Sequence, residues 1–172
     1  MKGKSLLVWV VLTLLIALMM APGSTMAQAD RAEFAGTEVP VGLLDEGIWV
    51  FLPSGNVHVR GMTTLYQEMA SDPRMSGLNT VVMNANWSPY FSGPMWGTSE
   101  SVISDSADCP GGGFWRGTWT GTMNADGSYS YRAIGKGLSG CVEGLLYTLI
   151  ATNPGGGELT TYTGEILDPK GE

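Results

Sequence analysis

One stretch of the chain carries the polar side chains best suited to acid–base chemistry. Residues 57–69 alternate as a long β-strand does, and His58, Arg60 and Glu68 then share one face. If that face pointed into a cavity, Arg60 and Glu68 could pair there, with His58 at the rim. Such a pair can bind a carboxylate or a carbonyl, or transfer a proton.

The same stretch also fits the opposite orientation. Its second face consists of Val57, Val59, Gly61, Thr63 and Leu65. Because apolar side chains usually face the core and polar ones the solvent, this alternation favours an outward polar face. Two hypotheses follow, an enzyme that uses Arg60, Glu68 and His58 and a protein without catalytic residues, and the second is favoured.

Signatures of other catalytic and cofactor-binding classes are missing from the sequence. His58 is the single histidine, which excludes zinc motifs built on two histidines. There is no Gly-x-Ser-x-Gly nucleophile elbow. The glycine runs at residues 111–113 and 155–157 lead into predicted strands and not into helices, so neither is a phosphate-binding loop. We therefore predict no cofactor and no metal.

Aromatic residues are the stronger indication of a ligand. Several come from strands expected to be neighbours, and the candidates for ligand binding are Trp96, Trp115, Trp119, Tyr131 and Tyr162. In a small barrel such side chains either fill the interior or line a pocket for one small molecule. A second group, Trp87, Tyr90 and Phe91, lies in or beside a loop and could rim a mouth or contact a glycan.

The elements that must hold these residues are short strands separated by turns rich in Gly and Pro. We expect strands at residues 48–52, 57–69, 77–87, 95–104, 128–136, 141–151 and 158–167, and one more that ends at a turn at 124–127. Residues 30–38 form a lead-in or a first short strand; residues 39–42 break it, and residues 43–47 and 137–140 are turns. The fold class is all-β, a single antiparallel up-and-down barrel of about eight strands, with a two-sheet β-sandwich as the alternative.

The strand before the 124–127 turn shows the clearest alternation in the chain. One face alternates bulky residues with glycine, as the tapering interior of a small barrel requires: Trp115, Gly117, Trp119, Gly121 and Met123. Arg116 and the threonines occupy the other face and are expected outside, as is Arg132 on the next strand.

The N-terminus reads as a secretory signal peptide over residues 1–29. Lys2 and Lys4 precede an apolar run at residues 6–20, and Ala27-Gln28-Ala29 is a typical cleavage site. An uncleaved membrane anchor is the alternative, although the run is short for a span. The expected mature chain is one domain at residues 30–172, secreted or periplasmic and free of the membrane.

The mature region is acidic and holds both cysteines. All 16 acidic residues but only seven of the nine basic ones lie in it, which gives a formal charge of −9. Such a surface repels nucleic acid. In an exported chain Cys109 and Cys141 are expected to form a disulfide, which would stabilise the fold by roughly 3–4 kcal/mol.

Five segments together resemble a group of uncharacterised exported bacterial β-barrel proteins: Val59-Arg60-Gly61, residues 72–77, Trp96-Gly97-Thr98, residues 113–121 and residues 164–169. The architecture of that group resembles the eight-stranded barrel of allene oxide cyclases and dirigent proteins. No residue matches a catalytic motif of either enzyme family, so the resemblance implies a fold and no site residues.

The first functional hypothesis is a non-enzymatic exported barrel. It would bind a small apolar or aromatic molecule, or a glycan at its mouth, or act as a structural or interaction module. The alternative is a cyclase- or isomerase-like enzyme that encloses a hydrophobic substrate. The orientation of residues 57–68 separates the two hypotheses.

Overall fold

Period-two alternation and turn residues divide the described chain, residues 30–155, 157 and 159–169 of the computed structural model, into nine strands and one short 3-10 helix. The predicted signal peptide lies outside the described residues. The elements are β1 (Asp30–Asp45), β2 (Ile48–Phe51), β3 (Val57–Ala70), η1 (Pro73–Met75), β4 (Gly77–Trp87), β5 (Gly93–Ile103), β6 (Gly113–Met123), β7 (Tyr129–Gly140), β8 (Leu146–Asn153) and β9 (Thr160–Asp168).

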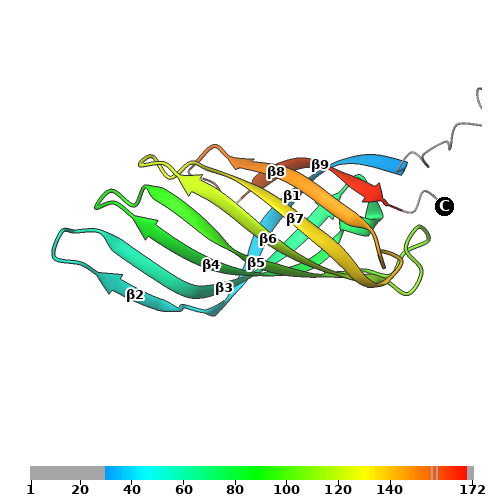
Figure 1. Cartoon of the computed structure of the whole chain (residues 1–172), viewed down its shortest axis with the longest axis horizontal. Helices are drawn as coiled ribbons and strands as arrows, with labels where there is room; N and C mark the ends of the chain where they lie inside the picture. Colours follow the sequence, from blue (N-terminus) through cyan, green and yellow to red (C-terminus); the bar gives the residue numbers. More distant parts are fainter. Residues whose placement is uncertain (1–29, 156, 158, 170–172) are drawn as a thin grey trace, which may run out of the picture.

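Antiparallel neighbours connect these strands into a closed barrel (Figure 1). From β3 to β9 each strand pairs with the next one in the sequence, and β1 pairs with both β9 and β3. Eight strands therefore form the closed wall, which confirms the predicted all-β barrel. The ninth strand, β2, pairs with the first residues of β3 and extends the wall beyond the closed part.

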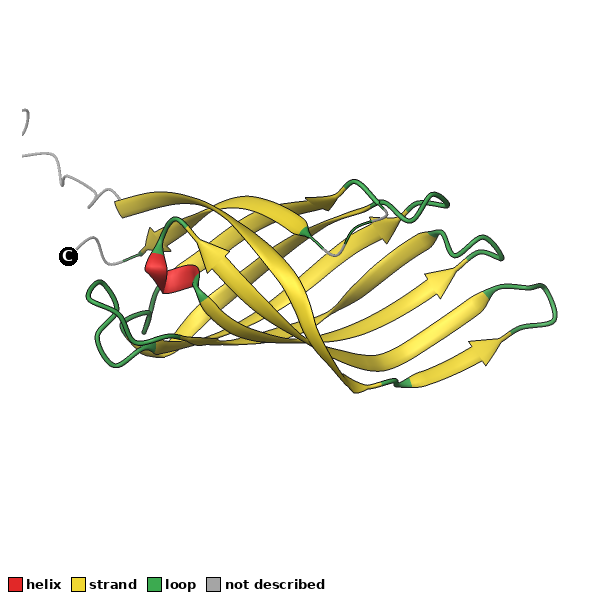
Figure 2. Cartoon of the chain, turned by 180° about the vertical axis from the view of Figure 1, so that it is seen from behind, coloured by secondary structure: helices red, strands yellow, loops and turns green. Residues whose placement is uncertain are grey.

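The two ends of the barrel differ. The hairpins β2–β3, β4–β5 and β6–β7 project at one end, which we call the hairpin end (Figure 1). At the other end, η1 lies near the C-terminus (Figure 2) and its Met75 is buried. We call this the η1 end. Among the described residues, no helix has the length and apolar character needed to cross a membrane.

The first strand corrects the sequence-based prediction. We expected residues 39–42 to interrupt it and residues 43–47 to turn, but β1 is continuous from Asp30 to Asp45. The pairing of β1 with β3 shifts between Pro40 and Gly42 and again between Leu43 and Asp45. A strand accepts proline at such irregular positions, because no ladder hydrogen bond is needed from its nitrogen. This long strand closes the barrel.

The region around the cysteines also differs from expectation. Residues 137–140 extend β7 and pair with β6, and residues 141–145 form the turn before β8. Gly140 makes this possible, because its φ of 70° suits glycine and begins the turn. Cys141 is bonded to Cys109, so the predicted disulfide is confirmed and links this turn to the loop before β6.

The interior of the barrel follows the predicted face of β6. Trp115 and Trp119 are buried, while Arg116 lies outside with Glu100 at 2.9 Å. Glycines let large rings lie against the wall: a Cβ at Gly117 would overlap the Tyr147 hydroxyl. Glycines that alternate with bulky residues therefore leave the space that tyrosine and tryptophan rings occupy inside a narrow barrel.

Candidate ligand-binding site

A β-bulge on β3 decides which side chains enter the barrel. Val59 lies opposite Ala85 of β4 and Met62 lies opposite Met83, so both Arg60 and Gly61 oppose a single residue, Asn84. Gly61 has a φ of 73°, which favours glycine, and its N–H donates to Asn84 Oδ1 at 3.2 Å. Such an extra residue bends the strand and reverses the face that later residues present.

The bulge corrects the expected orientation of this strand. Val57 and Val59 point inward as expected, but beyond Gly61 the inward residues are Met62, Thr64, Tyr66 and Glu68. Thr63 and Leu65, which we expected inside, take the other face. One of the three candidate catalytic residues, Glu68, therefore enters the interior.

Arg60 and His58 lie on the other side of the wall. The Arg60 guanidinium donates to the carbonyls of Val59 and Ala85 at 2.7 Å each, and it lies 5.3 Å from the centre of the Trp96 ring. His58 precedes the bulge and shares the outward face with Arg60. The structure does not bring Arg60 and Glu68 together, so the catalytic pair considered from the sequence does not form.

The barrel interior is only partly filled. It contains a cavity of about 200 Å³ that is partly open to solvent. Its wall combines aromatic and methionine side chains with a few polar ones: Glu38, Met62, Thr64, Tyr66, Glu68, Met75, Asn79, Val81, Met83, Trp87, Met95, Ser99, Ser101, Trp119, Met123, Tyr129, Tyr131, Ala133, Tyr147 and Leu149. Apolar walls with a few convergent polar groups are typical of small-molecule sites.

Two glutamates are the charged residues of this wall. Glu38 of β1 and Glu68 of β3 are direct partners in the strand pairing, and their exposed fractions are 4% and 5%. Glu38 Oε1 accepts a hydrogen bond from the Tyr131 hydroxyl at 2.8 Å. Glu68 Oε1 accepts one from Asn79 Nδ2, also at 2.8 Å.

Burial dominates the electrostatics of this pair. It raises the pKa of Glu38 from 4.5 to about 7, although the hydrogen bond from Tyr131 lowers it. Burial and the nearby charge of Glu38 raise the pKa of Glu68 to about 8, against the lowering effect of Asn79 and Ser101. Carboxyl groups with such values hold or release a proton near neutral pH.

Several polar atoms of the wall have no hydrogen-bond partner in the described part of the chain. Two are acceptors on neighbouring side chains, Glu68 Oε2 and Asn79 Oδ1, although the Ser101 hydroxyl is close enough to affect the Glu68 carboxyl. Two are donors, the indole nitrogens of Trp87 and Trp119. Leaving buried polar atoms unpaired is unfavourable, which makes this wall receptive to a polar ligand.

The aromatic candidates from the sequence take different places. Trp119 and Tyr131 line the cavity, with ring centres 5.7 Å apart. Trp115 is fully buried beyond the cavity wall, and Tyr162 is buried against Phe34. Trp96 lies on the outer face of β5 beneath Arg60. Two of the five candidates thus border the cavity.

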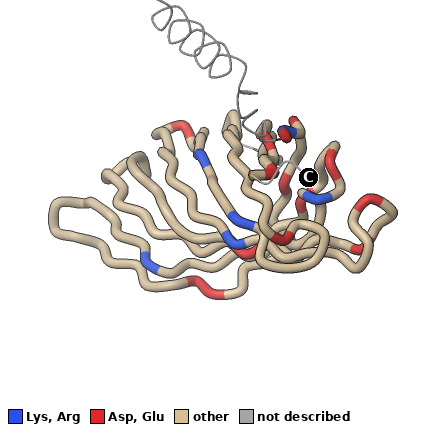
Figure 3. Tube along the Cα trace, turned by 45° about the vertical axis from the view of Figure 1, so that its right-hand side comes forward, with Lys and Arg blue, Asp and Glu red and all other residues tan. Residues whose placement is uncertain are grey.

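A chain of aromatic rings leads from the cavity to the hairpin end. Trp87 is 6% exposed and lines the cavity, and its ring centre lies 5.8 Å from Trp49 and 6.0 Å from Phe91. Trp49 in turn stacks on Phe51, which is 66% exposed. We call these four residues the aromatic rim. The turns at 52–56 and 88–92 beside it carry no charged residue (Figure 3).

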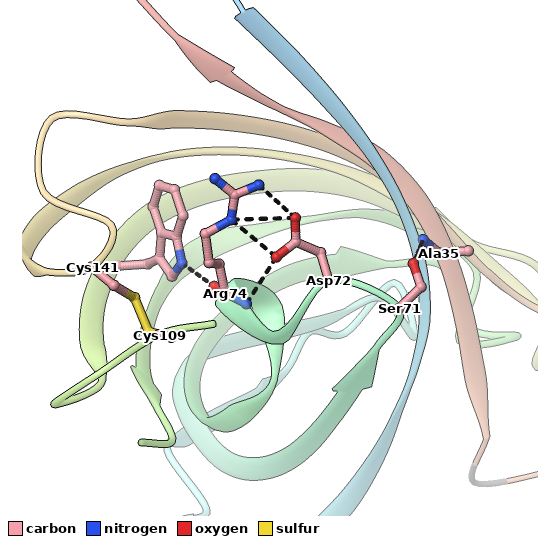
Figure 4. A network of polar contacts seen from close by, with 7 residues as sticks. Ala35, Ser71, Asp72, Arg74, Cys109 and Cys141 are labelled. Atoms are coloured by element: carbon pink, nitrogen blue, oxygen red, sulfur yellow. Dashed lines mark hydrogen bonds and ion pairs between the residues drawn. A yellow bond between two sulfur atoms is a disulfide. The ribbon is translucent and has the colours of Figure 1, made fainter. Parts of the chain in front are cut away.

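The η1 end is tied together by local contacts (Figure 4). Asp72 accepts from the Arg74 N–H at 3.0 Å and pairs with its guanidinium at 2.6 Å. The Arg74 carbonyl accepts from the Trp115 indole at 2.8 Å, and the Cys109–Cys141 disulfide lies at the same end of the barrel. Access to the cavity is therefore expected from the hairpin end.

Sequence reasoning missed Glu38 altogether. It lay in a segment treated as a lead-in, and only the pairing of β1 with β3 places it beside Glu68. Gly61 was the available signal for the inward position of Glu68, because glycine inside a strand often marks a bulge.

Among the described residues, no three His, Cys, Asp or Glu side chains are grouped to hold a metal ion. No family model, curated protein sequence or solved structure matches this chain.

Proposed function

We propose that this protein is an exported barrel that binds one small, mainly apolar or aromatic molecule in its interior. The observation that carries the proposal is the cavity of about 200 Å³, with aromatic and methionine walls and unpaired polar atoms. Export is supported by the signal-like segment at residues 1–29 and by a disulfide, which is compatible with an oxidising compartment. The resemblance to exported bacterial barrels is part of the same proposal.

The size of the cavity limits the ligand. A dry cavity of about 150 Å³ binds benzene in another protein, so about 200 Å³ suits a single ring with a short substituent. The aromatic rim offers such a molecule an apolar path from the solvent. Binding of a larger molecule would require part of it to remain at the rim.

A substitution that fills the cavity tests the proposal. Val81 lines the cavity and Val82, its neighbour on β4, points to the other face of the wall. We expect Val81→Phe to weaken the binding of 2-phenylethanol at least about tenfold, because the added ring occupies the ligand volume. Val82→Phe adds the same ring outside and should leave the affinity unchanged. Isothermal titration calorimetry of both variants and the wild type measures this difference.

Two outcomes of these binding experiments would contradict the proposal. Equal affinities in the two variants would place the probe outside the barrel. A wild-type protein that binds neither 2-phenylethanol nor other single-ring molecules would leave the interior without the proposed role. Native mass spectrometry of the protein from its exported fraction would identify a ligand retained from the cell.

The two buried glutamates favour a second candidate function, an enzyme of the isomerase type. With pKa values of about 7 and about 8, one carboxylate can take a proton from carbon while its protonated partner donates to a carbonyl oxygen. In this hypothesis Glu68 is kept from the sequence-based candidates, and Glu38 replaces Arg60 and His58 as its acid–base partner.

Proton exchange at carbon tests that candidate. We expect the protein in D2O to replace the hydrogens beside the carbonyl of phenylacetone by deuterium faster than buffer does, as measured by NMR. Glu38→Gln should reduce the rate to that of buffer, because Glu38 has the lower pKa and is the carboxylate of the pair, and an amide cannot accept the proton. Glu33→Gln, a change on the outer face of β1, should not affect it. A wild-type rate equal to that of buffer would exclude this activity for the ketone.

A further inference from the structure

The charged lining of the cavity is entirely acidic. Glu38 and Glu68 are its ionisable carboxyls, and among the described lining residues there is no Lys, Arg or His. The other ionisable groups that face the pair are tyrosines with raised pKa values, so they are neutral: Tyr66, Tyr129, Tyr131, Tyr147 and Tyr162. Nothing on the described wall can balance a negative charge.

The unpaired polar atoms beside the two glutamates are hydrogen-bond acceptors, so a ligand that pairs with them must be a hydrogen-bond donor. Glu68 Oε2 and Asn79 Oδ1 are both acceptors, their side chains are 5% and 6% exposed, and the two residues are joined by a hydrogen bond. A ligand that satisfies them must offer more than one N–H or O–H. A protonated primary amine has three N–H donors and no acceptor, whereas an alcohol has one donor.

The apolar part of the wall is compatible with the same chemistry. The faces of Trp and Tyr rings attract cations, most strongly where water is excluded. Trp87, Trp119 and Tyr131 line the cavity together with the glutamates, and five methionines are also among the lining residues. Such a wall accepts both an ammonium group and a hydrophobic body attached to it.

We propose that the ligand is a small primary amine, with a single ring or a similar apolar body and an ammonium group held between Glu38, Glu68 and Asn79. This inference rests on the proposed function, because it names the chemical class of the molecule that the cavity binds. The unoccupied pair can be neutralised by a proton, and the amine supplies the positive charge instead. The displaced proton then leaves to the solvent.

Two probes of nearly equal shape test the inference. We expect the protein to bind 2-phenylethylamine about ten to a hundred times more tightly than 2-phenylethanol at pH 8, since hydrogen bonds between charged groups are the stronger ones. Calorimetry in two buffers of different ionisation enthalpy should show about one proton released per amine bound at pH 7, and none for the alcohol. The affinity for the amine should fall as the pH is lowered to 6.

Substitution of the carboxyls locates the ammonium group. Glu68→Gln should remove most of the preference for the amine over 2-phenylethanol, whereas Glu33→Gln on the outer surface should leave both affinities unchanged. Equal affinities of the wild type for the two probes, without proton release, would overturn the inference and leave the proposed function standing. A preference that survives both Glu68→Gln and Glu38→Gln would also overturn it. If neither probe binds, the proposed function fails as well.

Discussion

Raising the pH from 5 to 8 is expected to destabilise the folded protein on the order of 6 kcal/mol, through the two buried glutamates alone. Folding raises the pKa of Glu38 from 4.5 to about 7 and that of Glu68 to about 8. Between pH 5 and pH 8 the folded state therefore binds more protons than the unfolded state. Stability from the pair is therefore fully present below pH 4.5 and is lost as the pH rises toward 8.

Two carboxyls with lowered pKa values, those of Asp72 and Asp126, do not oppose this trend in the same interval. Hydrogen bonds and the charge of Arg74 hold the pKa of Asp72 below its ordinary value in spite of burial, and contacts with Ser128 lower that of Asp126. Their contributions are complete above the ordinary carboxyl pKa and are lost only in more acidic solution. Because small domains are stable by about 5–15 kcal/mol, a loss of this size is easily measured.

Urea unfolding at a series of pH values, followed by far-ultraviolet circular dichroism, measures the expected slope. The double variant Glu38→Gln/Glu68→Gln should be nearly insensitive to pH between 5 and 8, and it should be more stable than the wild type at pH 8, because glutamine stays neutral. Glu33→Gln should keep the wild-type slope, and a His58→Gln background removes the single histidine. Wild-type stability that is constant or rises over this interval would refute the buried pair.

The pH effect depends on a feature that alternation alone could not predict. On β6, a regular strand, the spacing of Trp115, Gly117 and Trp119 identified the inward face correctly. On β3 the same reasoning failed after Gly61, because one extra residue reverses the face of every residue that follows. Both faces of that strand contain apolar residues, so neither orientation conflicts strongly with composition.

The closure of the barrel was also only partly predictable. Short turns and regular spacing predicted a meander of about eight strands, which the structure has. Because we expected a break near Pro40, the long strand β1 was not predicted. This is the strand that pairs with both β9 and β3 and so closes the barrel. Glu38 and Glu68 lie far apart in the sequence and become neighbours only through this closure, so local sequence patterns could not predict that they pair. The disulfide between Cys109 and Cys141 was easier to predict, because two cysteines allow one pairing within the chain.

The largest effect expected from a single substitution is at Trp115. Trp115→Ala should destabilise the protein by about 3–5 kcal/mol, the range for removing a buried aromatic side chain. The indole is fully buried, its ring centre lies 5.1 Å from that of Tyr147, and its N–H donates to the Arg74 carbonyl at 2.8 Å. The substitution removes this packing and leaves that carbonyl without its donor.

Trp96 provides the matched control for the same change. It lies on the outer face of β5, partly exposed, beneath the Arg60 guanidinium at 5.3 Å. Trp96→Ala should therefore lose a cation–π contact and some surface packing, about 1 kcal/mol. Urea unfolding of both variants must be followed by circular dichroism, since each substitution changes tryptophan fluorescence. Equal losses in the two variants, or a larger loss for Trp96→Ala, would contradict the placement of Trp115 on the inner face and of Trp96 on the outer face of the barrel wall.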